Sequence, residues 1–200
     1  MDKNINAKGL ACPKPVILTK KELDGIDSGS VTTEVDNIVA KENLSKLANS
    51  MNLEYTIKDF GNEHFAVTII KAFEDKVIEE KTLKKVDSDN MIIVIQSNEM
   101  GKGSEALGKL LMKSFIYTVK ETKPYPRAIL FYNSGVKLTC KDSDVLEDLI
   151  HLEKEGVEII SCGTCLDFYS IKDFLMVGSI SNMYTIYETM KSAANTIVIG

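Results

Sequence analysis

A charged stretch between Ala72 and Asn90 divides the sequence into two parts with different hydrophobic patterns. Ten of its residues are Asp, Glu or Lys, and few are large and apolar. This composition favours a solvated linker, part of which can be helical. A chain of 200 residues has room for two compact domains of about 100 residues each. We therefore expect domains at residues 1–71 and 90–200, joined by a linker at 72–89.

Composition excludes several classes of protein. Hydrophobic residues make up 44% of the chain and charged residues 26%, which is typical of a globular protein. The longest aliphatic run, Met91–Ile95, is far shorter than the roughly 18 residues that span a bilayer, and the first residues form no apolar signal segment. The net charge of −5, without a cluster of Lys and Arg, argues against nucleic acid as a partner. We expect a cytoplasmic protein with no membrane partner.

The first part carries alternating strand and helix signals. Residues 31–35 alternate with period two and are β-branched, which predicts a strand, while the apolar positions of 40–51 fall on one face of a helix. Residues 55–60 and 65–70 flank a turn and predict a hairpin. With a helix near Pro13 and a short strand before it, the order is β-α-β-α-β-β. Two helices on one face of a small sheet, a two-layer α/β sandwich, is the expected fold.

The second part predicts a doubly wound, mostly parallel sheet. The run at 91–95 is continuously apolar, as in a strand that is covered on both faces. Strand and helix signals then alternate, and an acidic variant of a capping box at Asp144–Glu147 is expected to begin the second helix. The expected strands are 91–95, 128–131, 157–160 and 196–199, and the expected apolar helix faces lie at Leu107, Leu110, Leu111, Phe115 and Val119, at Leu149 and Ile150, and at Met183, Ile186, Tyr187 and Met190. Because these helices are strongly apolar, we expect a homo-oligomer.

One cysteine lies where a helix is expected to begin. The segment Gly9-Leu-Ala-Cys-Pro-Lys-Pro15 directly precedes apolar positions at helical spacing, and proline is favoured at the first helical position. Cys12 is then expected at the N-cap, where the positive end of the helix dipole favours a thiolate or persulfide. Pro13 and Pro15 lack N–H groups, which leaves those of Lys14 and Val16 as donors. The alternative is that Cys12 is a small apolar residue that packs beside the helix.

The motif and the order of elements around Cys12 resemble those of the TusA/SirA-type sulfur carriers. The resemblance covers about residues 5–71 and includes the acidic Asp36 after the second expected strand. It implies that Cys12 carries a persulfide sulfur between enzymes, with Pro13, Lys14 and Pro15 in supporting positions. Ala7-Lys8 departs from the acidic residue that many members carry before the glycine, and this puts the choice of partner in question.

A second thiol site is expected at Cys162-Gly-Thr-Cys165, directly after the strand at 157–160. Two thiols at this spacing can close a disulfide, share a metal or pass a sulfur between them. Structural zinc would need four ligands, and only Cys140 and His151 could complete the set. Inert buried cysteines are another alternative. Thiol or chalcogen chemistry is the interpretation we favour.

Parallel sheets place their sites at the carboxyl ends of strands, and both Cys140 and the CxxC pair follow strands. A shared pocket is therefore expected, although Cys140 by itself has no motif. The segment Gly101-Lys-Gly-Ser-Glu-Ala106 matches a dinucleotide-binding pattern, but no acidic residue ends the next strand to bind a ribose. A loop that binds an anion at the start of the helix stays an alternative.

The second part resembles the DsrE/DsrF-like proteins of sulfur relay, on the strings Ser161–Tyr169 and Ser181–Tyr184. Together the two parts resemble YedF-type proteins associated with selenium metabolism. The resemblance implies a sulfur or selenium relay, sulfurtransferase-like, with Cys12, Cys162 and Cys165 as the reactive residues. It also implies a cysteine desulfurase-like donor and an acceptor protein. We expect no resident cofactor or metal. The alternative is a non-catalytic ligand-binding or redox-sensing protein that uses its second domain.

Overall fold

The computed structural model describes residues 1–11, 13–72 and 90–200. The chain divides into two compact units, Met1–Lys81 and Thr82–Gly200, each with its own hydrophobic core. Apart from Ala72, the linker expected at 72–89 lies outside the described residues. None of the helices in the described ranges combines the length and apolar character that crossing a bilayer requires.

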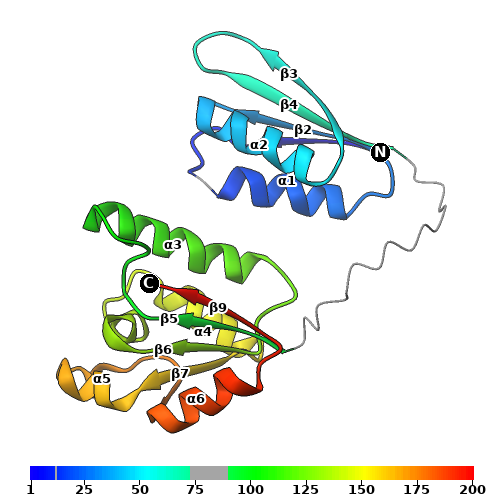
Figure 1. The fold of residues 1–200 in the computed structure, drawn as a ribbon. Coiled ribbons are helices and arrows are strands. Elements are labelled where there is room, and N and C mark those ends of the chain that lie inside the picture. The colour runs from blue at the N-terminus through cyan, green and yellow to red at the C-terminus, as the bar shows by residue number, and fades with distance from the viewer. Residues whose placement is uncertain (12, 73–89) are drawn as a thin grey trace. The chain divides into compact units, whose positions relative to one another are not determined.

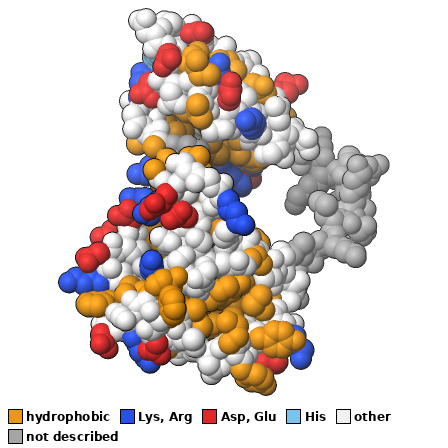
Figure 2. Space-filling view, turned by 60° about the vertical axis from the view of Figure 1, so that its left-hand side comes forward, with side chains coloured by type: hydrophobic (Ala, Val, Ile, Leu, Met, Phe, Trp, Pro, Cys, Tyr) orange, Lys and Arg blue, Asp and Glu red, His pale blue; other side chains and the backbone are white. Residues whose placement is uncertain are grey.

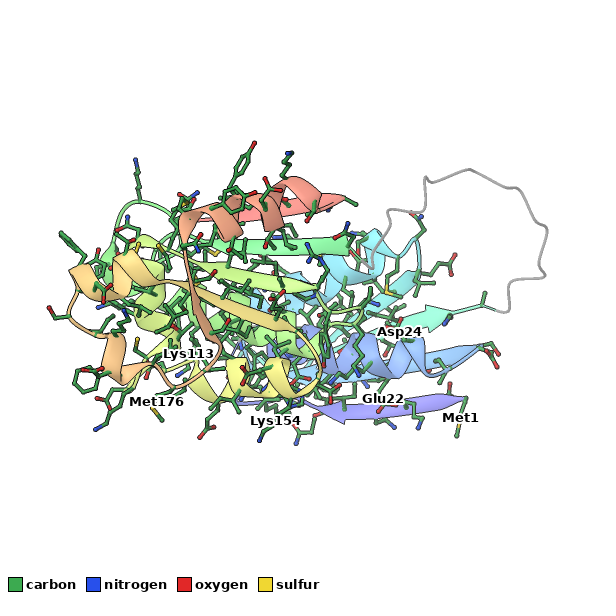
Figure 3. All side chains as sticks on the ribbon, turned by 90° about the horizontal axis from the view of Figure 1, so that it is seen from below. Met1, Glu22, Asp24, Lys113, Lys154 and Met176 are labelled. Carbon is green, nitrogen blue, oxygen red and sulfur yellow. The ribbon has the colours of Figure 1, made fainter. Side chains whose placement is uncertain are left out.

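The first unit is a four-stranded sheet with two helices, in the β-α-β-α-β-β order that the sequence predicts (Figure 1). The strand order is β1-β2-β4-β3, with β1 and β2 parallel and the other pairs antiparallel. Because a parallel pair needs a crossover, α1 connects β1 to β2. Met1, directly before β1, and Asp24, the last residue of α1, therefore lie at the same end of the unit (Figure 3). The elements are β1 Asp2–Asn6, α1 Lys14–Asp24, β2 Gly29–Val35, α2 Ile38–Ser50, β3 Glu54–Asp59 and β4 Phe65–Lys71.

The core of the first unit lies between one face of the sheet and the two helices. Burial in β2 alternates with period two, so that Val31, Thr33 and Val35 face the helices. The polar member of this row is satisfied: the Thr33 hydroxyl bonds the Thr19 hydroxyl of α1 at 2.7 Å, and Thr19 donates to the carbonyl of Pro15 at 2.8 Å. This chain of hydrogen bonds ties the first turns of α1 to the centre of the sheet.

The second unit is a five-stranded parallel sheet with helices on both faces, as expected (Figure 1). The strand order is β8-β7-β6-β5-β9, and β5 and β6 are buried almost throughout because both of their faces are covered. The elements are β5 Met91–Ile95, α3 Glu105–Glu121, β6 Ala128–Phe131, η2 Asn133–Thr139, α4 Leu146–Lys154, β7 Glu158–Cys162, α5 Gly163–Phe168, η3 Lys172–Phe174, β8 Ser179–Ser181, α6 Met183–Ser192 and β9 Asn195–Ile199.

The apolar face predicted for α3 is partly wrong. Leu107, Leu110 and Leu111 are exposed, and the residues that α3 buries are Gly108, Met112 and Ile116. The reason is close packing at the start of the helix, since a Cβ on Gly108 would lie 3.0 Å from Cβ of Glu99. The glycine side of the helix therefore turns inward. In α6, only Ile186 of the expected face is buried.

The helix caps also differ from the prediction. The N-cap of α4 is Val145, and its side chain makes no capping hydrogen bond, so the capping box expected at Asp144–Glu147 is wrong. Ser143 bonds the start of this helix instead, because its hydroxyl accepts from the N–H of Val145 at 3.4 Å, while its own N–H bonds the carbonyl of Cys140.

In the first unit, α2 has a side-chain cap that sequence analysis did not identify. It is Asn37, whose Oδ1 accepts from the N–H of Ala40 at 2.8 Å.

We predict that Leu44→Ala destabilises the first unit by about 2–5 kcal/mol, because Leu44 is 0% exposed and truncation leaves a cavity in the core. Val39→Ala on the same helix is the matched control, since Val39 is 61% exposed, and its effect should stay within about 0.5 kcal/mol. Urea unfolding, with hydrogen exchange of peptides from residues 38–50, measures both. Equal effects of the two substitutions would contradict the assignment of the core.

Candidate functional site

The segment from Gly9 to Pro15 connects β1 to α1 and carries the first predicted site. Cys12 itself lies outside the described residues. Among the described residues around it, the N–H of Leu10 bonds the carbonyl of Ala7 at 3.3 Å, and the N–H of Lys14 bonds the carbonyl of Ala11 at 3.1 Å.

The N-cap expected at Cys12 is wrong, because α1 begins at Lys14 and its N-cap is Pro13. Pro13 has φ −96° and ψ 7°, and its carbonyl accepts from Ile17 at 3.1 Å. Pro15 is then the second helical residue, where a missing N–H costs nothing. The expected donor at Lys14 is also corrected, since that N–H already bonds Ala11. The N-cap is thus one residue later in the chain than predicted, and Cys12 is the residue before it.

Asp36 holds this segment from the end of the neighbouring strand. Its Oδ2 accepts the N–H of Gly9 at 2.7 Å, and its Oδ1 accepts from the side-chain amide of Asn37 at 3.3 Å. Gly9 has φ +72°, a left-handed conformation that favours glycine. The contact forms because β1 and β2 are parallel and end at the same edge of the sheet. A charge-assisted bond of this kind fixes the loop before Cys12 relative to the start of α2.

Charged side chains form a small network beside this loop. Glu34 of β2 pairs with Lys8 at 2.7 Å and with Nε2 of His64 at 3.1 Å. The hydrogen bond from Lys8, followed by the one from His64, lowers the pKa of the Glu34 carboxyl. His64 also stacks on Phe60. The basic residue that departs from the family pattern, Lys8, is therefore neutralised locally.

The second predicted site lies at the carboxyl edge of the parallel sheet. Cys162 is the last residue of β7 and is 1% exposed, whereas Cys165 lies in α5 and is partly exposed. The Sγ of Cys165 accepts a hydrogen bond from the backbone N–H of Asn133 at 3.1 Å. Asn133 begins η2, two positions after the end of β6, and β6 is the parallel neighbour of β7. The pairing of β6 with β7 thus places the N–H of Asn133 beside the thiol of Cys165, the more exposed of the two.

Asn133 also bonds Tyr169, the C-cap residue at the end of α5. Its φ is +50°, and its Oδ1 accepts from the hydroxyl of Tyr169 at 3.0 Å. The ammonium of Lys137 lies 4.5 Å from the centre of the Tyr169 ring. Sequence analysis did not identify Asn133, Tyr169 or Lys137 as site residues. The available signal was an asparagine two positions after a buried strand, at the edge where parallel sheets place their sites.

Burial dominates the acidity of the outer thiol. It raises the pKa of Cys165, the Asn133 N–H lowers it in part, and the adjacent Cys162 thiol raises it further. Cys165 is therefore mostly protonated near neutral pH, with a preformed donor that favours the thiolate once it forms.

Cys140 has a different environment from the CxxC pair. It is buried, and its Sγ faces the carbonyls of Val136 at 3.3 Å and Ile171 at 3.7 Å. Burial raises the pKa of this thiol, against a smaller opposite effect of Thr139. The pocket that we expected Cys140 to share with the CxxC pair stays a prediction. Within residues 1–11, 13–72 and 90–200, no three His, Cys, Asp or Glu side chains are grouped as metal ligands.

These features define the first unit as a small two-layer domain with a cysteine motif before its first helix. Residues 3–71 match the family model "Sulfurtransferase TusA". A solved SirA-like protein from Desulfitobacterium hafniense is 37% identical over 34% of this chain and 95% of its own, with a TM-score of 0.33. The first unit is therefore a TusA-family domain.

Two further solved structures resemble the chain at lower identity. The ychN protein from E. coli is 15% identical over 56% of this chain and 99% of its own, with a TM-score of 0.45. A protein of unknown function from Methanobacterium thermoautotrophicum is 19% identical over 55% and 98%, with a TM-score of 0.43. No curated protein matches the sequence.

We predict that the alkylation rate of Cys165 rises with pH through a midpoint above that of an ordinary thiol, because only the thiolate reacts and burial raises its pKa. Iodoacetamide labelling from pH 6 to about 10.5, followed on the Cys165 peptide by mass spectrometry, measures the midpoint. A midpoint at or below that of free cysteine would contradict the described environment.

We predict that Asn133→Ala destabilises the second unit by about 1–2 kcal/mol, because alanine is strained at the positive φ of this position. Asn133→Gly, which adopts this φ freely, and Tyr169→Phe, which removes only the hydroxyl that bonds Asn133, should each cost less. Urea unfolding compares the three variants. Equal losses for alanine and glycine would show that backbone strain is not the cause.

Proposed function

We propose that this protein is a sulfur or selenium relay in which Cys12 carries a persulfide or selenopersulfide. The match of residues 3–71 to the TusA family is the observation that carries the proposal. The Gly-Leu-x-Cys-Pro-x-Pro motif directly before α1 supports it, and so does the bond from Gly9 to Asp36, which holds the residue that begins this motif. The positive end of a helix dipole stabilises a thiolate or persulfide anion near it.

Loading of Cys12 is a thiolate–persulfide exchange. The Cys12 thiolate attacks the outer sulfur of a donor persulfide, the donor's sulfur–sulfur bond breaks, and the donor thiolate leaves. The number of sulfur–sulfur bonds is unchanged, so no oxidant is needed. A cysteine desulfurase-type enzyme is the donor that this chemistry requires. The same balance holds when the transferred atom is selenium.

Release of the chalcogen takes place at the CxxC pair in this proposal. Cys165, the more exposed thiol, attacks the outer sulfur of the Cys12 persulfide and becomes a persulfide itself, while the Cys12 thiolate leaves. Cys162 then attacks the inner sulfur of that persulfide. A Cys162–Cys165 disulfide forms and hydrosulfide, or hydroselenide, leaves; the two thiols supply the two electrons. An acceptor protein can take the outer sulfur directly instead. A link to selenium metabolism, as in YedF-type proteins, is part of this proposal.

A second candidate function is redox sensing by the CxxC pair alone. The observation that favours it is the contact between the buried Cys162 and the accessible Cys165, which would let an oxidant close a disulfide. The two functions differ in whether Cys12 is needed.

We predict that incubation with a cysteine desulfurase and cysteine adds a sulfur atom to Cys12, because the residues that match the TusA family include its Cys-Pro-x-Pro motif. Trapping with an alkylating reagent and peptide mass spectrometry detects the product. Cys12→Ser should abolish the added mass. Cys140→Ser is the matched control and should retain it, because Cys140 is buried against main-chain carbonyls.

The variants of the CxxC pair separate the later steps. Cys162→Ser should accumulate persulfide on Cys165, and Cys165→Ser should leave the sulfur on Cys12 with no release of sulfide. A wild-type chain whose Cys12 never gains sulfur, while Cys162 and Cys165 still form a disulfide with an oxidant, would overturn the relay in favour of redox sensing.

A further inference from the structure

A cavity of about 360 Å³ lies in the second unit, and none of its lining residues is a cysteine. Its walls come from α3, from η2 and from the segment that joins η2 to α4, together with Asn98 after β5. β5 and β6 both end at this edge, which is where parallel sheets bind their ligands. Gly101 and Gly103, which sequence analysis considered for nucleotide binding, are not among its lining residues.

The walls of this cavity are rich in lysine. Four of its lining residues are Lys109, Lys113, Lys137 and Lys141, against the two carboxylates of Asp142 and Asp144. The whole chain has a net charge of −5, whereas the residues that line this cavity have an excess of positive charge. Like charges that converge on a hollow repel one another, and a bound anion removes that repulsion.

Two of the four lysines are available to a ligand. Lys109 pairs with Glu105 at 2.5 Å, and Lys137 lies over the ring of Tyr169. As far as the chain is described, the ammonium groups of Lys113 and Lys141 have neither an ion pair nor a hydrogen bond. Phosphate suits such groups, because lysine binds it as a mobile point charge.

The remaining lining argues for an organic ligand rather than a bare anion. The cavity is also lined by the buried Met112 and Val145 and by the partly buried Leu138, so part of its wall is apolar. Its volume falls in the range of small-molecule pockets, about 300–1,000 Å³, and exceeds what one phosphate fills. The two aspartates can accept hydrogen bonds from the hydroxyl groups of a sugar.

From these observations we infer that the cavity binds a phosphate ester with a hydroxyl-bearing body, either a sugar phosphate or a nucleotide. The phosphate lies between Lys113 and Lys141, and the body of the ligand lies against Met112, Leu138 and Val145. This inference does not depend on the proposed relay, because none of the cavity's lining residues is a cysteine.

Calorimetric titration of the full chain with inorganic phosphate, ribose 5-phosphate, AMP and ADP tests the inference. We expect at least one of the organic phosphates to bind about tenfold or more tightly than inorganic phosphate, because only they use the apolar wall. Tighter binding of ribose 5-phosphate than of AMP would identify a sugar phosphate, and the reverse a nucleotide. Inorganic phosphate binding as tightly as all of the esters, or the absence of binding by every probe, would overturn the inference.

Variants locate the binding. The double variant Lys113→Ala/Lys141→Ala should weaken binding of the favoured ester by about tenfold or more, because two charged contacts are lost. Lys154→Ala is the matched control: Lys154 is an exposed lysine at the end of α4, outside the cavity and away from Lys113 (Figure 3). Urea midpoints equal to wild type show that the variants fold. Unchanged affinity in the double variant would overturn the proposed location.

Discussion

In each unit, two parallel strands end at the same edge of a sheet, and the residues that follow them meet there. In the first unit, the segment after β1 meets the residue after β2, and Gly9 bonds Asp36. In the second, the segment after β6 meets the helix after β7, and Asn133 bonds Cys165. Parallel pairing forces each strand to leave the edge through a crossover. Strand register therefore brings these connecting segments together, and the bonds from Gly9 to Asp36 and from Asn133 to Cys165 join them.

The described thiols of the second unit differ in what surrounds them. Cys140 and Cys162 are both buried, but Cys140 is enclosed by main-chain carbonyls, whereas Cys162 adjoins Cys165. Apolar side chains gather on the face of this unit that Figure 2 shows. Between α5 and the end of α6, the large apolar residues that are exposed are Phe168, Phe174, Met176, Ile180, Met183, Tyr184 and Tyr187. Since α5 contains both Cys165 and Phe168, the accessible thiol belongs to a helix that also presents a large aromatic side chain to solvent.

Hydrophobic periodicity was sufficient to predict both architectures, because the strands at 31–35, 91–95 and 128–131 have patterns that only one environment satisfies. It was not sufficient to predict which face of α3 is buried, because leucines lie on several sides of this helix. The buried face is the one that contains Gly108, which packs closely against Glu99. The cap at Val145 and the start of α1 at Lys14 also depended on local turns that compete with the motif. Short β8 was not predicted, since three residues at a sheet edge carry little pattern.

The candidate sites were predictable only as far as their motifs extend. CxxC and the prolines after Cys12 are visible in the sequence, and so is Asp36. Asn133, Tyr169 and Lys137 have no motif, because their roles arise from the pairing of β6 with β7 and from the turn at the end of α5. The cavity was not predicted either, since its lysines come from segments that only the fold brings together.

Lys137 belongs to two neighbourhoods at once, as it lines the cavity and covers the ring whose hydroxyl bonds Asn133. An anion that draws this ammonium away from Tyr169 must compete with the aromatic ring for it. Binding of an anion in the cavity and the position of Lys137 beside Tyr169, near Cys165, are then energetically coupled. Such a coupling is reciprocal: whatever oxidation or loading of Cys165 does to ligand affinity, the ligand does to that reaction's equilibrium by the same factor.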